Sequence, residues 1–200
     1  MKVAIITDQH FGFKKGSKHF HSYFKKFYEN IFFPTLEKRG ITTVIDMGDT
    51  FDSRKGIDLY SLDWSQRNYF DRLRDMGCKL TSIVGNHTAF YKNTNDINTI
   101  DLLLREYDNI DVIVNTEERT FDNLKVLFVP WITSDDSERT YATIKDLLPK
   151  SVWVTSNSMD SLHIMDIQWK MVTMLSLSKN LLKLFLVITI LAPQMVLYLI

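Results

Sequence analysis

The stretch TTVIDMGDTFD, residues 42–52, carries the clearest structural signal in the chain. Its first six residues form a short, largely apolar and β-branched run, which is typical of a buried strand. Gly48 lets the backbone turn sharply at the end of that strand, and Asp49 and Asp52 follow at once. The stretch therefore predicts a strand that delivers two carboxylates to one edge of a sheet.

Similar apolar runs recur along the first 150 residues and alternate with segments of helical periodicity. The predicted strands cover residues 3–7, 42–47, 80–84, 111–114 and 125–129, and the predicted helices cover residues 20–36, 59–74, 97–107 and 138–148. We expect Gly40 to end the first of these helices. Alternating strands and helices predict an α/β domain with a largely parallel sheet.

Polar side chains follow the first three predicted strands, where each strand ends. Asp8 and His10 follow the first strand, Asp49 the second, and Asn86 and His87 the third. Taken singly, such residues are usually turn or cap residues. Together they indicate a metal site, because ligands bind beyond the carboxyl ends of parallel strands and hard divalent cations take oxygen and imidazole ligands. A closely spaced metal pair also needs a carboxylate between its ions.

The three motifs, D-x-H at 8–10, G-D-x-x-D at 48–52 and G-N-H at 85–87, resemble those of the calcineurin-like metallophosphoesterase superfamily. The sequence around these motifs is similar to that of phage recombination endonuclease subunits. Those proteins are relatives of the SbcD-type nucleases that work with an SMC-like ATPase. The stretches that carry this likeness are HFG at 10–12, GDTFDSRKG at 48–56, IVGNHTAFYKNTN at 83–95 and LFVPWI at 127–132. The resemblance covers roughly residues 1–150 and implies a metallophosphoesterase αββα sandwich, truncated here.

The resemblance also implies a ligand set for two divalent cations, expected to be Mn²⁺ with Mg²⁺ as the alternative. Asp8 and His10 would hold the first cation, Asp49 would bridge both, and Asn86 would hold the second. His87 would lie beside the scissile phosphate and steady or protonate the leaving oxygen.

Two further positions near this site depart from or vary within the family pattern. Asp52 lies where relatives vary, so we expect it to orient a ligand. Thr88 stands where the family has Asp or Glu after G-N-H, which is expected to weaken the hydrogen bonding around His87 without removing a metal ligand.

Two cations that share a water would generate hydroxide for attack on a phosphodiester, so the favoured interpretation is a DNA endonuclease or exonuclease subunit for phage recombination and repair. DNA would be held through its phosphates. The candidate contacts are Lys14, Lys15, Arg54 and Lys92, with Lys18 and Lys55 nearby. Solvated loop charge is the alternative interpretation of each. The expected partners are DNA and an SMC-like ATPase, with a homodimer as a further expectation.

Composition restricts where the protein works but does not reveal its substrate. The chain has 24 basic residues (Lys and Arg) and 24 acidic residues (Asp and Glu). Its net charge therefore does not indicate a nucleic-acid or membrane partner. Cys78 is the single cysteine, which excludes an intrachain disulfide, and the apolar run at residues 3–6 is too short for a signal peptide. We expect a cytoplasmic protein of a phage-infected bacterium.

The last 50 residues differ in composition from the rest of the chain. Residues 151–200 contain five charged side chains and no glycine, but five of the eight methionines. Leu181–Ile200 has the length of a membrane span. Lys183, Pro193 and the absence of a flanking basic cluster argue against that interpretation, and we expect no genuine membrane association.

A shifted reading frame explains this tail better. Reading each codon one nucleotide earlier forces glycine at four junctions: Trp153/Val154, Met159/Asp160, Met165/Asp166 and Met171/Val172. With permitted third bases the shifted frame spells Gly-His-x-Glu and Gly-His-x-His, the later ligand motifs of the superfamily, which are absent in frame. We therefore predict an incomplete nuclease domain at 1–150 and an out-of-frame tail at 151–200. A one-nucleotide slip near residues 149–152, in the gene or in its sequencing, would produce both.

Two alternatives to a DNA nuclease stay open. One keeps the fold and metals but takes a phosphoprotein or a small phosphodiester as substrate. The other is an inactive fragment, because half of the second metal's ligands are absent in frame.

Overall fold

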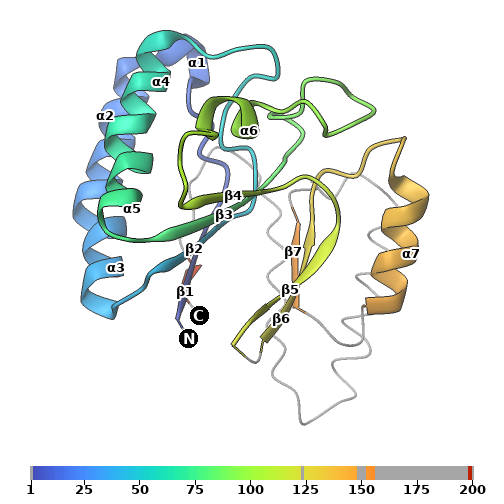
Figure 1. Cartoon of the computed structure of the whole chain (residues 1–200). Helices are drawn as coiled ribbons and strands as arrows, with labels where there is room; N and C mark the ends of the chain where they lie inside the picture. Colours follow the sequence, from blue (N-terminus) through green and yellow to red (C-terminus); the bar gives the residue numbers. More distant parts are fainter. Residues whose placement is uncertain (1, 123, 148–151, 156–197, 200) are drawn as a thin grey trace.

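The computed structural model describes residues 2–122, 124–147, 152–155 and 198–199 (Figure 1). The predicted boundary at residue 150 and most of the predicted tail lie outside these residues. The described part of the chain contains no helix that is both long enough and apolar enough to span a membrane.

The first sheet has five strands in the order β4-β3-β2-β1-β8. Its strands are β1 (Val3–Ile6), β2 (Thr43–Asp46), β3 (Lys79–Ile83), β4 (Ile110–Ile113) and β8 (Tyr198–Leu199). β1 to β4 pair in parallel, as the sequence predicts, whereas β8 pairs antiparallel to β1. Because β1, β2 and β3 are parallel neighbours, the loops that follow them leave the sheet at the same edge.

A second sheet contains β5 (Glu117–Phe121), β6 (Leu124–Val129) and β7 (Val152–Thr155). β5 and β6 form an antiparallel hairpin, and β7 pairs in parallel with β6. β5 is absent from the predicted strands because its sequence, EERTF, has no alternation of apolar and polar residues. Its pairing with β6, rather than its own propensity, makes it a strand.

Two long helical rods are assembled from shorter elements. The first contains α2 (Lys18–Phe27), a π-helical segment (Tyr28–Phe32) and α3 (Phe33–Arg39), and it ends where Gly40 adopts φ 61°. The second contains α4 (Leu59–Ser65), a π-helical segment (Gln66–Phe70) and α5 (Asp71–Asp75). Both predicted helices and the predicted role of Gly40 are therefore confirmed. The remaining helices are α1 (Phe13–Gly16), α6 (Thr99–Leu104) and α7 (Ser137–Leu147).

The layers follow the order helices, first sheet, second sheet, helix (Figure 1). Successive side chains of a strand point to opposite faces, and β1 shows the consequence. Ala4 and Ile6 pack with the aromatic core under the two rods, whereas Val3 and Ile5 pack with residues of the second sheet such as Phe128. The central strands are thus buried on both faces, and the predicted mixed α/β fold with its αββα layers is confirmed.

Candidate metal centre

The loops after β1 and β2 run side by side and are joined by main-chain hydrogen bonds. Asp8 N donates to Gly48 O at 3.2 Å, and His10 N donates to Asp49 O at 2.9 Å. A short parallel bridge between Phe11 and Phe51 continues the pairing beyond the strands. These bonds fix the two loops relative to each other at the carboxyl edge of the sheet.

Three of the predicted ligand residues have an unusual backbone conformation. Asp8, His10 and Asp49 have φ values of 54°, 46° and 52°. Non-glycine residues seldom adopt positive φ, and such conformations cost about 1–3 kcal/mol each and concentrate at functional sites. The surrounding structure must therefore hold these residues in place.

Gly85 allows the loop after β3 to approach this pair of loops. A Cβ atom at position 85 would lie 2.2 Å from Asp49 Oδ1 and 2.6 Å from Asp49 N. No side chain fits there without moving the main chain of Asp49, so the close approach requires glycine.

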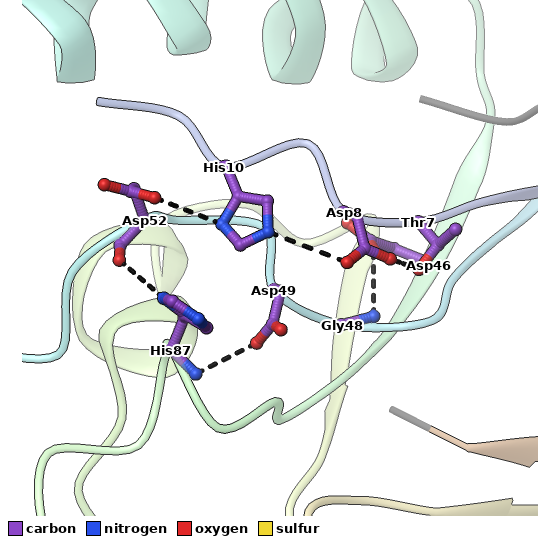
Figure 2. Close-up of polar contacts among 8 residues, drawn as sticks. All are labelled: Thr7, Asp8, His10, Asp46, Gly48, Asp49, Asp52 and His87. Carbon is purple, nitrogen blue, oxygen red and sulfur yellow. Dashed lines mark hydrogen bonds and ion pairs between the residues drawn. The ribbon is translucent and has the colours of Figure 1, made fainter. Parts of the chain in front are cut away.

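The side chains of the three loops converge (Figure 2). Asp8, His10 and Asp49 each offer a ligand atom, and these atoms lie within 4.8 Å of one another. His10, Asp52 and His87 form a second such group that shares the imidazole of His10. His10 Nε2 lies 3.6 Å from Asp8 Oδ1, and His10 Nδ1 lies 3.3 Å from Asp52 Oδ1. These five residues are called the site cluster below.

His87 is held by two hydrogen bonds to the neighbouring loop. Its amide donates to Asp49 Oδ1 at 2.9 Å, and its Nδ1 lies 2.8 Å from the main-chain oxygen of Asp52. Because a carbonyl oxygen only accepts, Nδ1 must carry the hydrogen. Nε2 is therefore the nitrogen that can exchange a proton. The rings of His10 and His87 meet edge to face at 4.8 Å.

The electrostatics of the site cluster favour a positive charge. Burial by itself would lower the pKa of His10, but the carboxylates of Asp8, Asp49 and Asp52 raise it above its usual value. Burial raises the pKa of Asp49, although the His87 amide and the two imidazoles oppose that shift. Carboxylates crowded in a partly buried site are relieved by a cation.

The donor set fits a divalent cation. Two carboxylates and an imidazole are ligands that Mn²⁺ and Mg²⁺ accept. His10 Nδ1 is also buried and, within the described residues, makes no hydrogen bond despite its nearness to Asp52. Because Nδ1 faces Asp52, the nitrogen of His10 that can bind a cation is Nε2, which lies 3.6 Å from Asp8 Oδ1.

The structure brings together most of the predicted site residues. Asp8, His10 and Asp49 converge as expected, and Asp52 contacts His10 as a residue that orients a ligand would. Asn86 is partly buried one residue before His87, and its role as a ligand stays a prediction. The metal and catalytic roles of the other residues also stay predictions.

Thr88 makes its side-chain hydrogen bonds within its own loop, and its expected weakening of the hydrogen bonding around His87 stays a prediction. Its hydroxyl accepts from Gly85 N at 2.9 Å and donates to Gly85 O at 3.0 Å, so it closes the loop on itself. His87 keeps the two hydrogen bonds described above. Thr88 thus stabilises the loop that carries Asn86 and His87.

The four candidate DNA contacts have different surroundings. The ammonium of Lys14 lies 5.7 Å and 5.4 Å from the ring centroids of Phe13 and Phe20, while Lys15 and Lys92 are exposed. Arg54 lies 4.5 Å from the ring centroid of Trp131, with a buried Nη1 for which the described residues provide no acceptor.

Trp131 was not singled out as a site residue from the sequence. Its amide donates to Val84 O at 2.8 Å, so the loop after β6 is tied to the end of β3, immediately before Gly85. The signal that could have identified it is its place in LFVPWI, directly after a predicted strand.

A second polar group lies behind the site cluster and was also missed. It contains Gln9, Tyr28, Asp46 and Thr50, all of them buried, and is called the buried cluster below. None of these residues has a recognisable functional signal in the sequence. Gln9 only separates two candidate ligands, and Asp46 lies within a predicted strand.

Fold and site together define an α/β protein with a candidate divalent-cation centre at the carboxyl edge of its parallel sheet. Over 109 residues, 54% of this chain, the sequence is 35% identical to Exonuclease subunit 1 of Enterobacteria phage T4. This similarity confirms the predicted resemblance to phage nuclease subunits. The match spans about a third (32%) of that protein's length.

A solved structure, described as a novel archaeal phosphodiesterase, matches with a TM-score of 0.38 and 15% identity, covering 73% of this chain and 67% of that one. No protein-family model matches the chain.

Proposed function

We propose that this chain carries the catalytic centre of a metal-dependent phosphodiesterase that acts on DNA, as a nuclease subunit in phage recombination and repair. The observation that carries the proposal is the convergence of ligand atoms from Asp8, His10 and Asp49, three residues from two loops, within 4.8 Å. The similarity to a phage exonuclease subunit supports the choice of DNA as substrate.

Asp8 and His10 would hold one divalent cation, Asn86 a second, and Asp49 would bridge them. We propose Mn²⁺ for both, with Mg²⁺ as the alternative. When bound, a cation pair of this kind lowers the pKa of a shared water so that hydroxide can attack phosphorus near neutral pH. The positive φ at Asp8, His10 and Asp49 supports this assignment, because strained backbone is retained where it serves a function.

His87 would act on the leaving group. Its Nδ1 hydrogen is engaged by the main-chain oxygen of Asp52, so in the imidazolium form Nε2 would carry the second proton and would stabilise the departing oxygen or transfer that proton to it. Asp52 has two positioning contacts, one through its carbonyl to His87 and one through its carboxylate to His10. Both imidazoles are thereby oriented by the same residue.

Arg54, Lys14, Lys15 and Lys92 would bind DNA phosphates near this centre. Arg54 is the strongest candidate, because its guanidinium is held against Trp131 while a buried N–H lacks an acceptor among the described residues. A phosphate oxygen would supply that acceptor. We further propose an SMC-like ATPase as partner, a homodimeric assembly, and action in the cytoplasm of the infected bacterium.

Calorimetric titration of the chain with Mn²⁺, followed by hydrolysis of double-stranded DNA and of a small phosphodiester, tests the proposal. We expect Mn²⁺ binding that Asp49→Asn abolishes and that Asp63→Asn, a matched change at an exposed position, leaves intact. Metal-dependent release of nucleotides from DNA supports a nuclease, whereas turnover of the small ester alone favours the phosphodiesterase alternative. A chain that binds one cation weakly and has no turnover corresponds to the inactive-fragment alternative.

We also propose that residues 151–200 are read out of frame. The different composition of these residues and the forced glycines of the shifted frame support this proposal. Sequencing the coding DNA across codons 145–155 tests it directly. An intact frame there refutes the slip.

A further inference from the structure

Gln9 lies between two proposed metal ligands but is oriented away from solvent. Its side chain is fully buried, whereas Asp8 and His10 on either side of it are partly exposed. Burial of a primary amide is unfavourable unless its polar atoms form hydrogen bonds. The hydrogen-bond partners of Gln9 therefore indicate its role.

Both ends of the Gln9 amide are bonded within the buried cluster. Nε2 donates to Asp46 Oδ2 at 2.8 Å, and Oε1 accepts from the Tyr28 hydroxyl at 2.5 Å. Tyr28 begins the π-helical segment of the first rod, and Asp46 ends β2. The Gln9 amide therefore links the loop after β1 to the first helical rod and to β2.

Asp46 extends these links to the other metal-ligand loop. Its Oδ1 accepts from Gly48 N at 3.0 Å, and its Oδ2 also accepts from Thr50 Oγ1 at 2.9 Å. Gly48 and Thr50 flank Asp49 in the sequence. One buried carboxylate thus bonds residues on both sides of the proposed bridging ligand, and one buried amide lies between the other two ligands.

We propose that Gln9 is a positioning residue, which holds Asp8 and His10 in their metal-binding geometry through its hydrogen bonds to Asp46 and Tyr28. The inference rests on the proposed function. Its physical basis is that residues 8 and 10 have a left-handed backbone conformation, which persists only where surrounding contacts hold it in place. A buried side chain between those two residues, bonded through both its nitrogen and its oxygen, supplies such a constraint.

The pattern of donors and acceptors provides a charge-conserving test. Gln9→Glu alone sets two buried carboxyl groups against each other. Gln9→Glu with Asp46→Asn restores the bond in the reverse sense, because the new amide at position 46 donates to the new carboxylate at position 9. Tyr28 can still donate to residue 9, and Gly48 N can still donate to residue 46. Thr50 then accepts from the new amide and donates to Ser82, which lies 3.4 Å away in the native chain.

The experiment is calorimetric titration of each variant with Mn²⁺ alone, at a temperature where thermal unfolding shows it to be folded. Gln9→Glu is expected to weaken Mn²⁺ binding by about 10–100-fold, the loss seen when groups that orient metal ligands are removed. The double variant is expected to recover affinity to within about threefold of wild type. Gln66→Glu, the same change on the second helical rod, is the matched control and should bind like wild type.

Tyr28→Phe covers the case in which Gln9→Glu does not fold, because it removes only the hydroxyl that bonds Gln9. We expect it to weaken Mn²⁺ binding by several-fold and to leave a folded chain. A merely structural role would lower the unfolding temperature of these variants without changing their Mn²⁺ affinity when folded.

The outcomes are distinct for the two proposals. Wild-type Mn²⁺ affinity in Gln9→Glu or in Tyr28→Phe, or a double variant no better than its parents, overturns the positioning role while leaving the metal centre standing. A wild-type chain that binds no Mn²⁺ overturns the proposed function and this role with it.

Discussion

The site cluster and the buried cluster are built from adjacent residues of the same two loops, yet they differ in almost every physical respect. Asp8, His10 and Asp49 have positive φ, and their ligand atoms are crowded within 4.8 Å of one another. Gln9 and Asp46, by contrast, are buried and bonded at both ends of their polar groups.

The contrast between the two clusters explains how a strained polar site can be maintained. Polar groups that satisfy one another contribute rigidity but have no capacity left for a ligand, whereas groups left unsatisfied can bind one at a cost in stability. In the loop after β1 the two kinds of residue alternate. The side chain of Gln9 holds the backbone, and its neighbours Asp8 and His10 face the site. Substitutions in and around the two clusters test whether their roles differ in this way.

His87→Gln is expected to give the largest effect, a fall of about 10²–10⁴-fold in turnover of a phosphodiester, because it removes the nitrogen proposed to protonate the leaving oxygen. Mn²⁺ affinity and unfolding temperature should change little. Initial rates with saturating Mn²⁺ measure the effect, and His19→Gln, at an exposed histidine, is the control. Equal rates for the two variants would remove His87 from the chemistry.

Asp46→Asn should change how stability depends on pH. Burial raises the pKa of Asp46 from 3.8 to about 7, so the folded state binds the proton more tightly than the unfolded state. The stability that this proton contributes is full below about pH 4 and is lost as pH rises through 7. The difference in unfolding free energy between wild type and Asp46→Asn should shift by up to about 4 kcal/mol between pH 4 and 8.

Urea unfolding at several pH values measures this shift. Asp63→Asn, at an exposed carboxylate paired with Arg67, is the matched control. A difference between wild type and Asp46→Asn that stays constant with pH would mean that Asp46 titrates normally and that the buried cluster is less enclosed than its contacts indicate.

Asp52→Asn is expected to weaken Mn²⁺ binding by about 10–100-fold, because the Asp52 carboxylate is the group that faces His10 Nδ1 at 3.3 Å. Its main-chain oxygen remains, so the tautomer of His87 should be unaffected. Calorimetry measures the affinity, with Asp75→Asn as an exposed control. Unchanged affinity would assign Asp52 to the scaffold instead of the site.

Trp131→Leu should produce the smallest effect, a loss of about two- to fivefold in affinity for a short DNA duplex at low salt. This corresponds to the about 0.5–1 kcal/mol of a cation–π contact. The loss should vanish in an Arg54→Ala background, because Trp131 would act only through the Arg54 guanidinium. Fluorescence anisotropy measures binding, and Tyr91→Leu, at an exposed aromatic residue, is the control. Additive losses would mean that Trp131 contacts DNA independently.

The predicted elements agree closely with the structure where hydrophobic pattern decides. The strands that carry the site are buried on both faces, and their apolar runs identify them without ambiguity. β5 was missed because EERTF becomes a strand only through its hairpin partner. The sequence predicted that the polar side chains of the first two loops lie together, because ligand-type residues that recur after successive parallel strands meet at one edge of the sheet.

The hydrophobic pattern of the sequence is sufficient to predict the alternation of buried strands and amphipathic helices. It therefore also predicts the edge of the sheet that carries Asp8, His10, Asp49, Asn86 and His87. The contacts around these residues could not be predicted in the same way: Gln9 with Asp46 and Tyr28, His87 with Asp52, and Arg54 with Trp131. The physical reason is that apolar periodicity is a local property of the chain. Hydrogen-bond satisfaction and charge proximity depend instead on which distant segments meet when the sheet forms.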